Sequence, residues 1–176
     1  NPMDTIRKMR SSMEMNIIGA IVFLLILLGL LVSAQGFFSF VTAFEKEYST
    51  STYHMADTAT RLINADNLDA YLAGEKQEEY LKTRGFLDTY CKTMSVSLVY
   101  VIKVDQSDYG RFAAVFNAVD NDVDNSSYVA WELGFKRDTT KEEYRQKYRK
   151  LYEKQSLYET VYRKKTTDGQ HPHITT

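Results

Sequence analysis

Residues 17–34 read IIGAIVFLLILLGLLVSA, and thirteen of these eighteen residues are Leu, Ile, Val or Phe. No charged residue lies between Glu14 and Glu45. On an insertion scale, the thirteen apolar side chains favour the bilayer by about 4–8 kcal/mol in total. A run of this length also matches a hydrocarbon core that is about 30 Å thick. We therefore predict a transmembrane helix over residues 16–41.

The charges that flank this segment predict its orientation. Arg7, Lys8 and Arg10 precede the apolar run, and basic residues are retained on the cytoplasmic side of a membrane. We expect residues 1–15 to be cytoplasmic and residues 42–176 to be extracellular. Within this sequence the chain would then cross the cell membrane once.

Two other interpretations of the segment stay open. A cleaved signal peptide has about 7–15 apolar residues and a small-residue cleavage site, for which Val32-Ser33-Ala34 would serve. The run here is longer and continues into Phe37 and Phe38. The second alternative is a buried core helix of a soluble protein. Cleavage, like membrane spanning, leaves the rest of the chain outside the cytoplasm.

Length and charge limit the remaining possibilities. The 176 residues allow one ordinary domain beyond the anchor. A net charge of −1 gives no field that would attract nucleic acid, so we expect no nucleic-acid partner. Cys91 is the only cysteine, which excludes an internal disulfide. Because the sequence starts at Asn1 rather than Met and stops abruptly at Thr176, we expect a C-terminally truncated piece of a longer protein.

Helical spacing of apolar residues continues beyond the anchor. No Gly or Pro interrupts residues 37–73, so we expect the membrane helix to continue as a stalk. Within this stretch Asp66 is a candidate cap for a short helix through Tyr71, which Gly74 would end. A further helical pattern covers residues 75–94.

The pattern then changes to that of β-strands. Residues 96–104, VSLVYVIKV, are rich in β-branched and aromatic side chains and predict a central strand. A turn at residues 106–110 and a strand at residues 112–119 would complete a hairpin. Residues 120–127 are a polar loop, and residues 131–135 are a candidate short strand.

A last helix and a second hairpin follow. Thr139 with Glu142, or Thr140 with Glu143, has the spacing of a capping box that starts a helix. We expect this helix to turn the following apolar residues inward: Tyr144, Tyr148, Leu151, Tyr152 and Leu157. Two strands are predicted to follow, at residues 158–165 and 171–176. This order predicts the α+β class, with a central antiparallel sheet flanked by helices mostly on one side.

Four segments occur in an order typical of one sensor family: SLVYVIKVDQ (97–106), YGRFAAVFNAVD (109–120), YVAWELG (128–134) and TTDGQHPHITT (166–176). Together with the membrane and stalk helix, this order resembles a single Cache domain, the extracellular PAS-like sensor of bacterial receptors. The resemblance covers residues 37–176. In this family, one more strand and a second membrane helix normally follow the last segment.

The resemblance implies a small ligand bound on the sheet and a homodimer formed through stalk helices. It also implies a cytoplasmic effector: a chemoreceptor module, histidine kinase, cyclase or phosphatase. The segment 166–176 resembles most those receptors whose output is a PP2C-type phosphatase. Neither ligand nor effector follows from the residues themselves.

The aromatic residues of the predicted inner strands are the best candidates for a pocket. Tyr100, Tyr128 and Trp131 lie on or beside these strands, and Arg111 and Asp120 are near them in sequence. Small-ligand sites are mostly apolar with a few polar groups. Arg111 and Asp120 would suit an amino acid or a carboxylate. The alternative is that these aromatic residues are ordinary core.

Other motifs give no site. Residues 120–125 place acidic residues at alternate positions, but Asn125 stands where an EF-hand needs Gly, and Trp131 where it needs Glu. His171 and His173 are too few for a structural zinc site. Cys91 is expected to be a buried small apolar residue, with an intermolecular disulfide as the alternative. We predict no metal and no cofactor.

The functional prediction is therefore a sensor rather than an enzyme. The sequence has no Gly-x-Ser-x-Gly elbow, no phosphate loop and three histidines, two of them in one turn. We expect an extracytoplasmic region that binds a small molecule and signals through stalk helices. The alternative is a membrane-anchored structural or interaction domain without a small ligand. An anchored extracellular enzyme is the third hypothesis.

Overall fold

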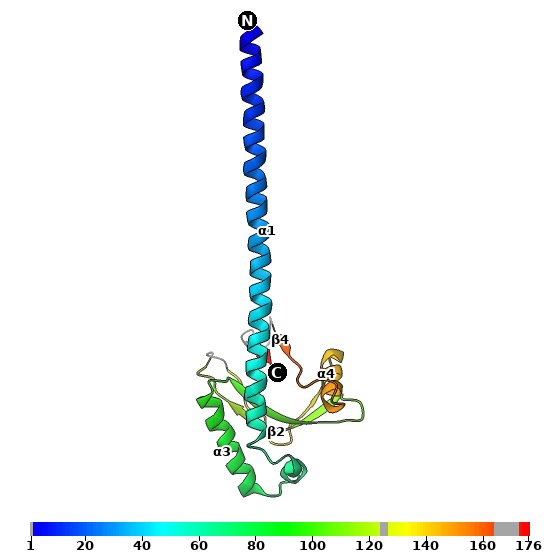
Figure 1. The fold of residues 1–176 in the computed structure, drawn as a ribbon. Helices are drawn as coiled ribbons and strands as arrows, with labels where there is room; N and C mark the ends of the chain where they lie inside the picture. Colours follow the sequence, from blue (N-terminus) through cyan, green and yellow to red (C-terminus); the bar gives the residue numbers. More distant parts are fainter. Residues whose placement is uncertain (1, 124–126, 164–172) are drawn as a thin grey trace. The chain divides into compact units, whose positions relative to one another are not determined.

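The computed structural model describes residues 2–123, 127–163 and 173–176. Its elements (Figure 1) are α1 Pro2–Thr60, the 3₁₀ turn η1 Ala65–Asn67, α2 Leu68–Leu72, α3 Gln77–Thr93, β1 Leu98–Val104, β2 Arg111–Val119, β3 Lys136–Asp138, α4 Glu142–Tyr152, β4 Val161–Arg163 and β5 His173–Thr175. The chain forms two compact units, Asn1–Glu47 and Tyr48–Thr176, and α1 contributes residues to both. The predicted α+β class is confirmed, with a long apolar N-terminal helix and a small antiparallel sheet.

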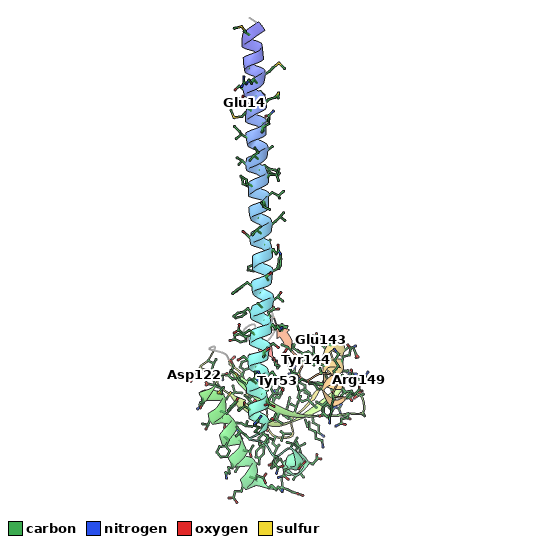
Figure 2. All side chains as sticks on the ribbon, viewed as in Figure 1. Glu14, Tyr53, Asp122, Glu143, Tyr144 and Arg149 are labelled. Atoms are coloured by element: carbon green, nitrogen blue, oxygen red, sulfur yellow. The ribbon has the colours of Figure 1, made fainter. Side chains whose placement is uncertain are left out.

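The first unit is the N-terminal part of α1. Every residue from 8 to 40 is exposed, and the most apolar 18-residue window has a mean hydropathy of 3.0. Figure 2 shows side chains projecting from all sides of this helix. A helix that is apolar all round requires a lipid or protein environment. By length and composition, α1 is able to cross a membrane.

Helix α1 continues beyond the apolar segment, as the predicted stalk does. It stops at Thr60, and bonds such as Leu62 N–H to the Ala59 carbonyl, at 3.0 Å, close its last turn. Ala59 is only 4% exposed, and Ile63 packs against the same core. The predicted stalk helix is therefore present as far as Thr60, and a separate short helix follows it, as predicted. Packing of the following turn, rather than Gly or Pro, ends the helix.

The short helix after this turn is capped by a different residue from the predicted one. The cap of η1 is Asn64 rather than Asp66. The Asn64 side chain accepts a hydrogen bond from the backbone N–H of Asp66. Helix α2 then ends before Gly74, whose φ of +78° suits glycine. The end at Gly74 is as predicted.

The core of the second unit lies between the helices and β2. Its buried members are Ala59, Tyr71, Leu87, Cys91, Val115, Phe116 and Ala118. Two tyrosine hydroxyls join the elements around it: Tyr90 donates to the Met55 carbonyl at 2.8 Å, and Tyr80 donates to the Val115 carbonyl at 3.1 Å. Helix α3 is thereby tied both to the end of α1 and to the sheet (Figure 1).

The larger sheet has the strand order β1-β2-β3, and all its pairs are antiparallel. The predicted hairpin of β1 and β2 is confirmed. The central strand of the described sheet is β2, so the prediction that residues 96–104 form the central strand is wrong. Both strands are rich in apolar residues, and composition does not distinguish the strand that has two neighbours.

A bulge at Val115 interrupts the alternation of β2. Val101 pairs with Phe116 and Ile102 pairs with Ala114, which leaves Val115 without a partner in β1. Val115 and Phe116 therefore both reach the core, each about 1% exposed. Residues before the bulge lie on the face opposite to the one that strict alternation would give them.

The sheet thus has two faces with different surroundings. The helix face, which is turned towards α2 and α3, carries Val99, Val101, Lys103, Arg111, Ala113, Phe116 and Ala118. The opposite face, called the Trp131 face because Trp131 lies against it, carries Tyr100, Ile102, Val104, Phe112, Ala114 and Asn117.

The segment after β2 differs from the prediction in two places. Residues 131–135 are not a strand, and β3 follows them. The predicted capping box at the start of α4 is also wrong: Lys141 occupies the cap position, and no side chain caps the helix. Thr139 lies two residues before the cap position, where its backbone N–H extends the sheet by bonding to the Gly110 carbonyl at 2.8 Å.

Helix α4 buries less than predicted. Tyr144 and Tyr148 are half-buried, but Leu151, Tyr152 and Leu157 are exposed. Of the predicted strands at residues 158–165 and 171–176, the structure shows the short strands β4 and β5, which pair antiparallel in a separate two-stranded sheet, whereas residues 158–160 are not in a strand.

Candidate functional site

An aromatic cluster lies on the Trp131 face. The Trp131 ring is 5.8 Å from Tyr100, 5.6 Å from Phe112 and 5.8 Å from Phe135, measured between ring centroids. The Arg137 guanidinium lies 5.9 Å from the Trp131 ring centroid. Two of the predicted pocket residues, Tyr100 and Trp131, are therefore in contact. Both residues are half-buried, so part of each remains exposed.

Asn117 is the polar residue of this face that sequence reasoning missed. It pairs with Tyr100 across the hairpin and is 7% exposed. Its Oδ1 is buried and accepts no hydrogen bond from any described residue. An unpaired buried acceptor costs about 1–3 kcal/mol. The signal in the sequence is an amide within the apolar run FAAVFNAV of β2.

The structure does not bring Arg111 and Asp120 together. Arg111 is the first residue of β2 and Asp120 follows its last residue, so nine steps of extended chain at about 3.3 Å each separate them by about 30 Å. The Asp120 side chain accepts the backbone N–H of Asp122 at 3.1 Å. Tyr128 lies beside the start of this loop, where its backbone exchanges two hydrogen bonds with the Asn121 side chain.

Arg111 also lies on the other face of the sheet from Tyr100. Its Nε donates to Asp138 Oδ1 at 2.8 Å, and Asp138 is its cross-strand partner in β3. The bulge at Val115 explains this position. Strict alternation from Asn117 would have placed Arg111 on the Trp131 face.

Near Arg111 the helix face contains an open groove of about 510 Å³. Ala113 forms part of its floor, and the basic residues Lys103, Arg111 and Lys136 line it. Lys103 pairs with Asp69 of α2. The sequence offered no signal for this groove, because the three basic residues are far apart along the chain.

The last part of α1 contacts the segment that precedes β4. The Ser49 and Thr160 hydroxyls are hydrogen-bonded, and the Tyr53 and Tyr158 rings stack with centroids 4.7 Å apart. Lys147 of α4 donates to the Thr160 carbonyl at 2.7 Å. Helix α4 and the end of α1 therefore hold the same short segment.

Cys91 is fully buried in the core, as predicted. Its thiol donates to the Val96 carbonyl. Burial raises the pKa of the Cys91 thiol from 9.0 to about 11. The neutral thiol is therefore favoured in the folded state. The stability that the neutral Cys91 thiol contributes to the folded state is present below about pH 9 and is lost as the pH rises towards 11.

We expect iodoacetamide to label Cys91 at pH 8 about a hundredfold more slowly in the folded chain than in urea, because the thiolate is the reactive form. Burial slows the reaction further. Mass spectrometry of the alkylated chain measures both rates. Labelling at similar rates in the two states would contradict the buried position.

Two motifs fall largely outside the described residues. The acidic loop is described at residues 120–123 only, and the pair His171 and His173 has no described side chains. Within the described part of the chain, no three His, Cys, Asp or Glu residues are grouped as a metal ion would require.

No family model, curated protein or solved structure matches this chain.

The turn that holds Trp131 against the sheet depends on Gly134. Its φ is +81°, and its N–H donates to the Ala114 carbonyl at 2.8 Å. We expect Gly134→Ala to destabilise the second unit by about 1–2 kcal/mol, because a Cβ disfavours this backbone region. Gly85→Ala is the matched control. In the exposed middle of α3, where nothing lies within 4 Å of the added Cβ, it should stabilise by up to about 1 kcal/mol. Urea unfolding measures both, and equal effects would contradict the assigned turn.

Proposed function

We propose that this chain is the extracytoplasmic sensing region of a bacterial membrane receptor, with a Cache-like domain that binds a small molecule on the Trp131 face. Helix α1 anchors it with residues 1–15 in the cytoplasm. Two copies associate through their stalk helices and signal to a cytoplasmic effector outside this chain. The resemblance of residues 97–120 and the apolar helix support this proposal.

The buried Oδ1 of Asn117 is the observation that carries the ligand site. Among the described residues it has no donor, and it lies opposite Tyr100, whose ring contacts Trp131. Apolar walls with one oriented polar group are typical of small-molecule sites. A ligand N–H, such as the ammonium of an amino acid, would satisfy this oxygen.

The contacts of α1 support the signalling part of the proposal. A ligand changes a receptor only through its different affinity for two states. The segment held by Ser49, Tyr53 and Lys147 is well placed to differ between such states, because it joins α4 to the end of α1. Changes on the sheet can then reach the helix that leads to the membrane segment.

The test is a thermal-shift screen of the full chain in lipid nanodiscs against amino acids, carboxylates and nucleobases. A ligand of the Trp131 face should raise the unfolding temperature of the wild-type chain, and Trp131→Ala should weaken its binding at least about tenfold. Val129→Ala is the control, because this neighbouring side chain is 85% exposed. A hit that survives Trp131→Ala unchanged would contradict this site.

Asn117→Val separates ligand binding from folding. We expect this variant to be as stable as the wild type or about 1 kcal/mol more stable, because it removes an unpaired acceptor from a strand. The thermal response to the ligand should be lost. Chemical unfolding without ligand gives the first quantity and the screen gives the second. A destabilisation of more than about 2 kcal/mol would show that Asn117 has a structural role instead.

The second candidate is an interaction domain that binds no small ligand. The mutual contacts of Tyr100, Phe112, Trp131 and Phe135 favour it, because aromatic residues that pack on each other need no ligand. A broad screen without any hit, on a chain that unfolds cooperatively, would support this candidate over the sensor.

The orientation is tested by cysteine labelling. In a Cys91→Ser background, Gln106→Cys in the exposed hairpin turn should react with a membrane-impermeant maleimide on intact spheroplasts. Ser11→Cys, at the other end of the apolar segment, should react only after lysis. The reverse pattern would place the folded unit in the cytoplasm.

A further inference from the structure

The groove on the helix face gathers basic residues around a small one. Lys103 and Lys136 are the cross-strand partners of Ala113 in β1 and β3, so they flank it on both sides. Arg111 lies two residues from Ala113 on the same face. Partners in adjacent strands have Cβ atoms about 5 Å apart. Three cations therefore surround one methyl group.

The floor of the groove is open because Ala113 does not fill it. The groove has a volume of about 510 Å³, and besides the three cations and Ala113 it is lined by Val104, Asp105, Gln106 and Phe112. Among the lining residues three cations thus stand against one carboxylate, and Asp108 adds a further negative charge near Arg111. Asp105 Oδ1 also accepts the Ser107 backbone N–H at 2.9 Å, which engages it in the hairpin turn.

The ion pairs of these cations are exposed and easily exchanged. Arg111 is bonded through Nε to Asp138, and Lys103 to Asp69, but both carboxylates lie outside the groove lining. Their side chains are 64% and 76% exposed, and exposed pairs contribute about 0–1 kcal/mol each. Within the described part of the chain, Lys136 has no ion pair. The terminal guanidinium nitrogens of Arg111 and the Lys136 ammonium are therefore available to a ligand.

We propose that this groove is an anion site that binds a phosphate group between Lys103, Arg111 and Lys136 over Ala113. A guanidinium and two ammonium groups match the several oxygens of a phosphate, and charge-assisted hydrogen bonds are the stronger ones. Such an anion also relieves the repulsion between cations that flank one residue. The phosphate is either free in solution, on a small solute, or on an anionic lipid headgroup.

The site is independent of the ligand site proposed above. Asn117 lies on the Trp131 face and does not line the groove, whose three cations belong to the helix face, although Val104 and Phe112 of the Trp131 face also line it. Phosphate binding is therefore expected to persist in Asn117→Val. Failure of the sensor screen would not bear on the anion site. Failure of the phosphate titration would not bear on the proposed ligand site of the sensor.

The test titrates inorganic phosphate into the full chain in phosphatidylcholine nanodiscs, with chloride at equal ionic strength as the reference. Amide resonances of Ala113 and its neighbours should shift with a saturable dependence on phosphate. Lys136→Gln should weaken binding about tenfold. Lys92→Gln, an exposed lysine in the last turn of α3, is the matched control and should change binding less than twofold.

Ala113→Leu tests the floor without changing the charge. It should abolish binding while the amide spectrum outside the groove stays that of the folded chain. If this variant does not fold, Lys136→Gln decides alone, because this side chain is exposed. A second arm uses nanodiscs that contain phosphatidylglycerol and no free phosphate. Shifts at Ala113 that Lys136→Gln removes would identify the lipid headgroup as the source.

Three results would overturn the proposal. The first is no shift at Ala113 beyond that of chloride in either arm. The second is equal weakening by Lys136→Gln and Lys92→Gln, which would indicate general screening. The third is binding that persists unchanged when Leu fills the floor at position 113.

Discussion

Replacing Leu25 and Leu28 together by Arg is expected to release the chain from the membrane. Both leucines lie near the middle of the apolar segment of α1. On an insertion scale each change from Leu to Arg costs about 3–4 kcal/mol, so the pair costs about 6–8 kcal/mol. This equals or exceeds the whole favourable insertion energy of residues 17–34. Alkaline carbonate extraction of cell membranes measures the outcome, with the wild-type chain in the pellet and the double variant in the supernatant.

Ser11→Arg with Ser12→Arg is the matched control for this experiment. It adds the same charge four residues or more before the apolar run, on the side where basic residues are already present. The control should stay in the pellet. If the wild-type chain itself is extracted by carbonate, or purifies without detergent, α1 is not a membrane span.

The second large effect concerns the core. Phe116→Ala should destabilise the second unit by about 3–5 kcal/mol, the usual cost of deleting a buried aromatic ring. Phe116 is 1% exposed, stacks on Tyr80 with centroids 4.9 Å apart and meets the edge of Tyr71 at 5.5 Å. Small domains are stable by about 5–15 kcal/mol in total, so the variant should be near its unfolding midpoint at low urea. Urea unfolding of the chain in nanodiscs, followed by Trp131 fluorescence, measures the change.

Phe86→Ala is the control for this core variant. Phe86 lies on α3, but its side chain is 49% exposed. Truncating it should cost less than about 1 kcal/mol, because little apolar area leaves the protein interior. Equal losses for the two variants would mean that Phe116 does not lie in the core described above.

The elements that were predicted correctly have strong local patterns. The apolar run of α1 is long and continuous. The helix predicted at residues 75–94 has apolar residues at helical spacing, and the strands on either side of residues 106–110 are rich in apolar residues. The errors occur at ends and caps. Helix α1 ends at Thr60, and Lys141 is the cap of α4. Both positions depend on contacts with distant parts of the chain, such as the hydrogen bond between Thr139 and Gly110.

The candidate site was predicted only in part for the same reason. Tyr100 and Trp131 meet as expected, but the prediction grouped Arg111 and Asp120 with them by closeness in sequence. Each residue of extended chain adds about 3.3 Å, and neighbouring side chains of a strand point to opposite faces of the sheet. Asn117 and the basic groove become visible only when strand register is known.

Local pattern alone establishes that this chain has an apolar segment able to span a membrane and an α+β unit after it, because hydrophobic run length and periodicity are properties of neighbouring residues. It does not establish which side chains share a face. One unpaired residue, Val115, reverses the alternation of β2 and sends Arg111 to the helix face and Phe112 to the Trp131 face. That bulge is stabilised by packing Val115 and Phe116 together against Tyr80 and α3, and such packing exists only after the distant segments have folded onto one another.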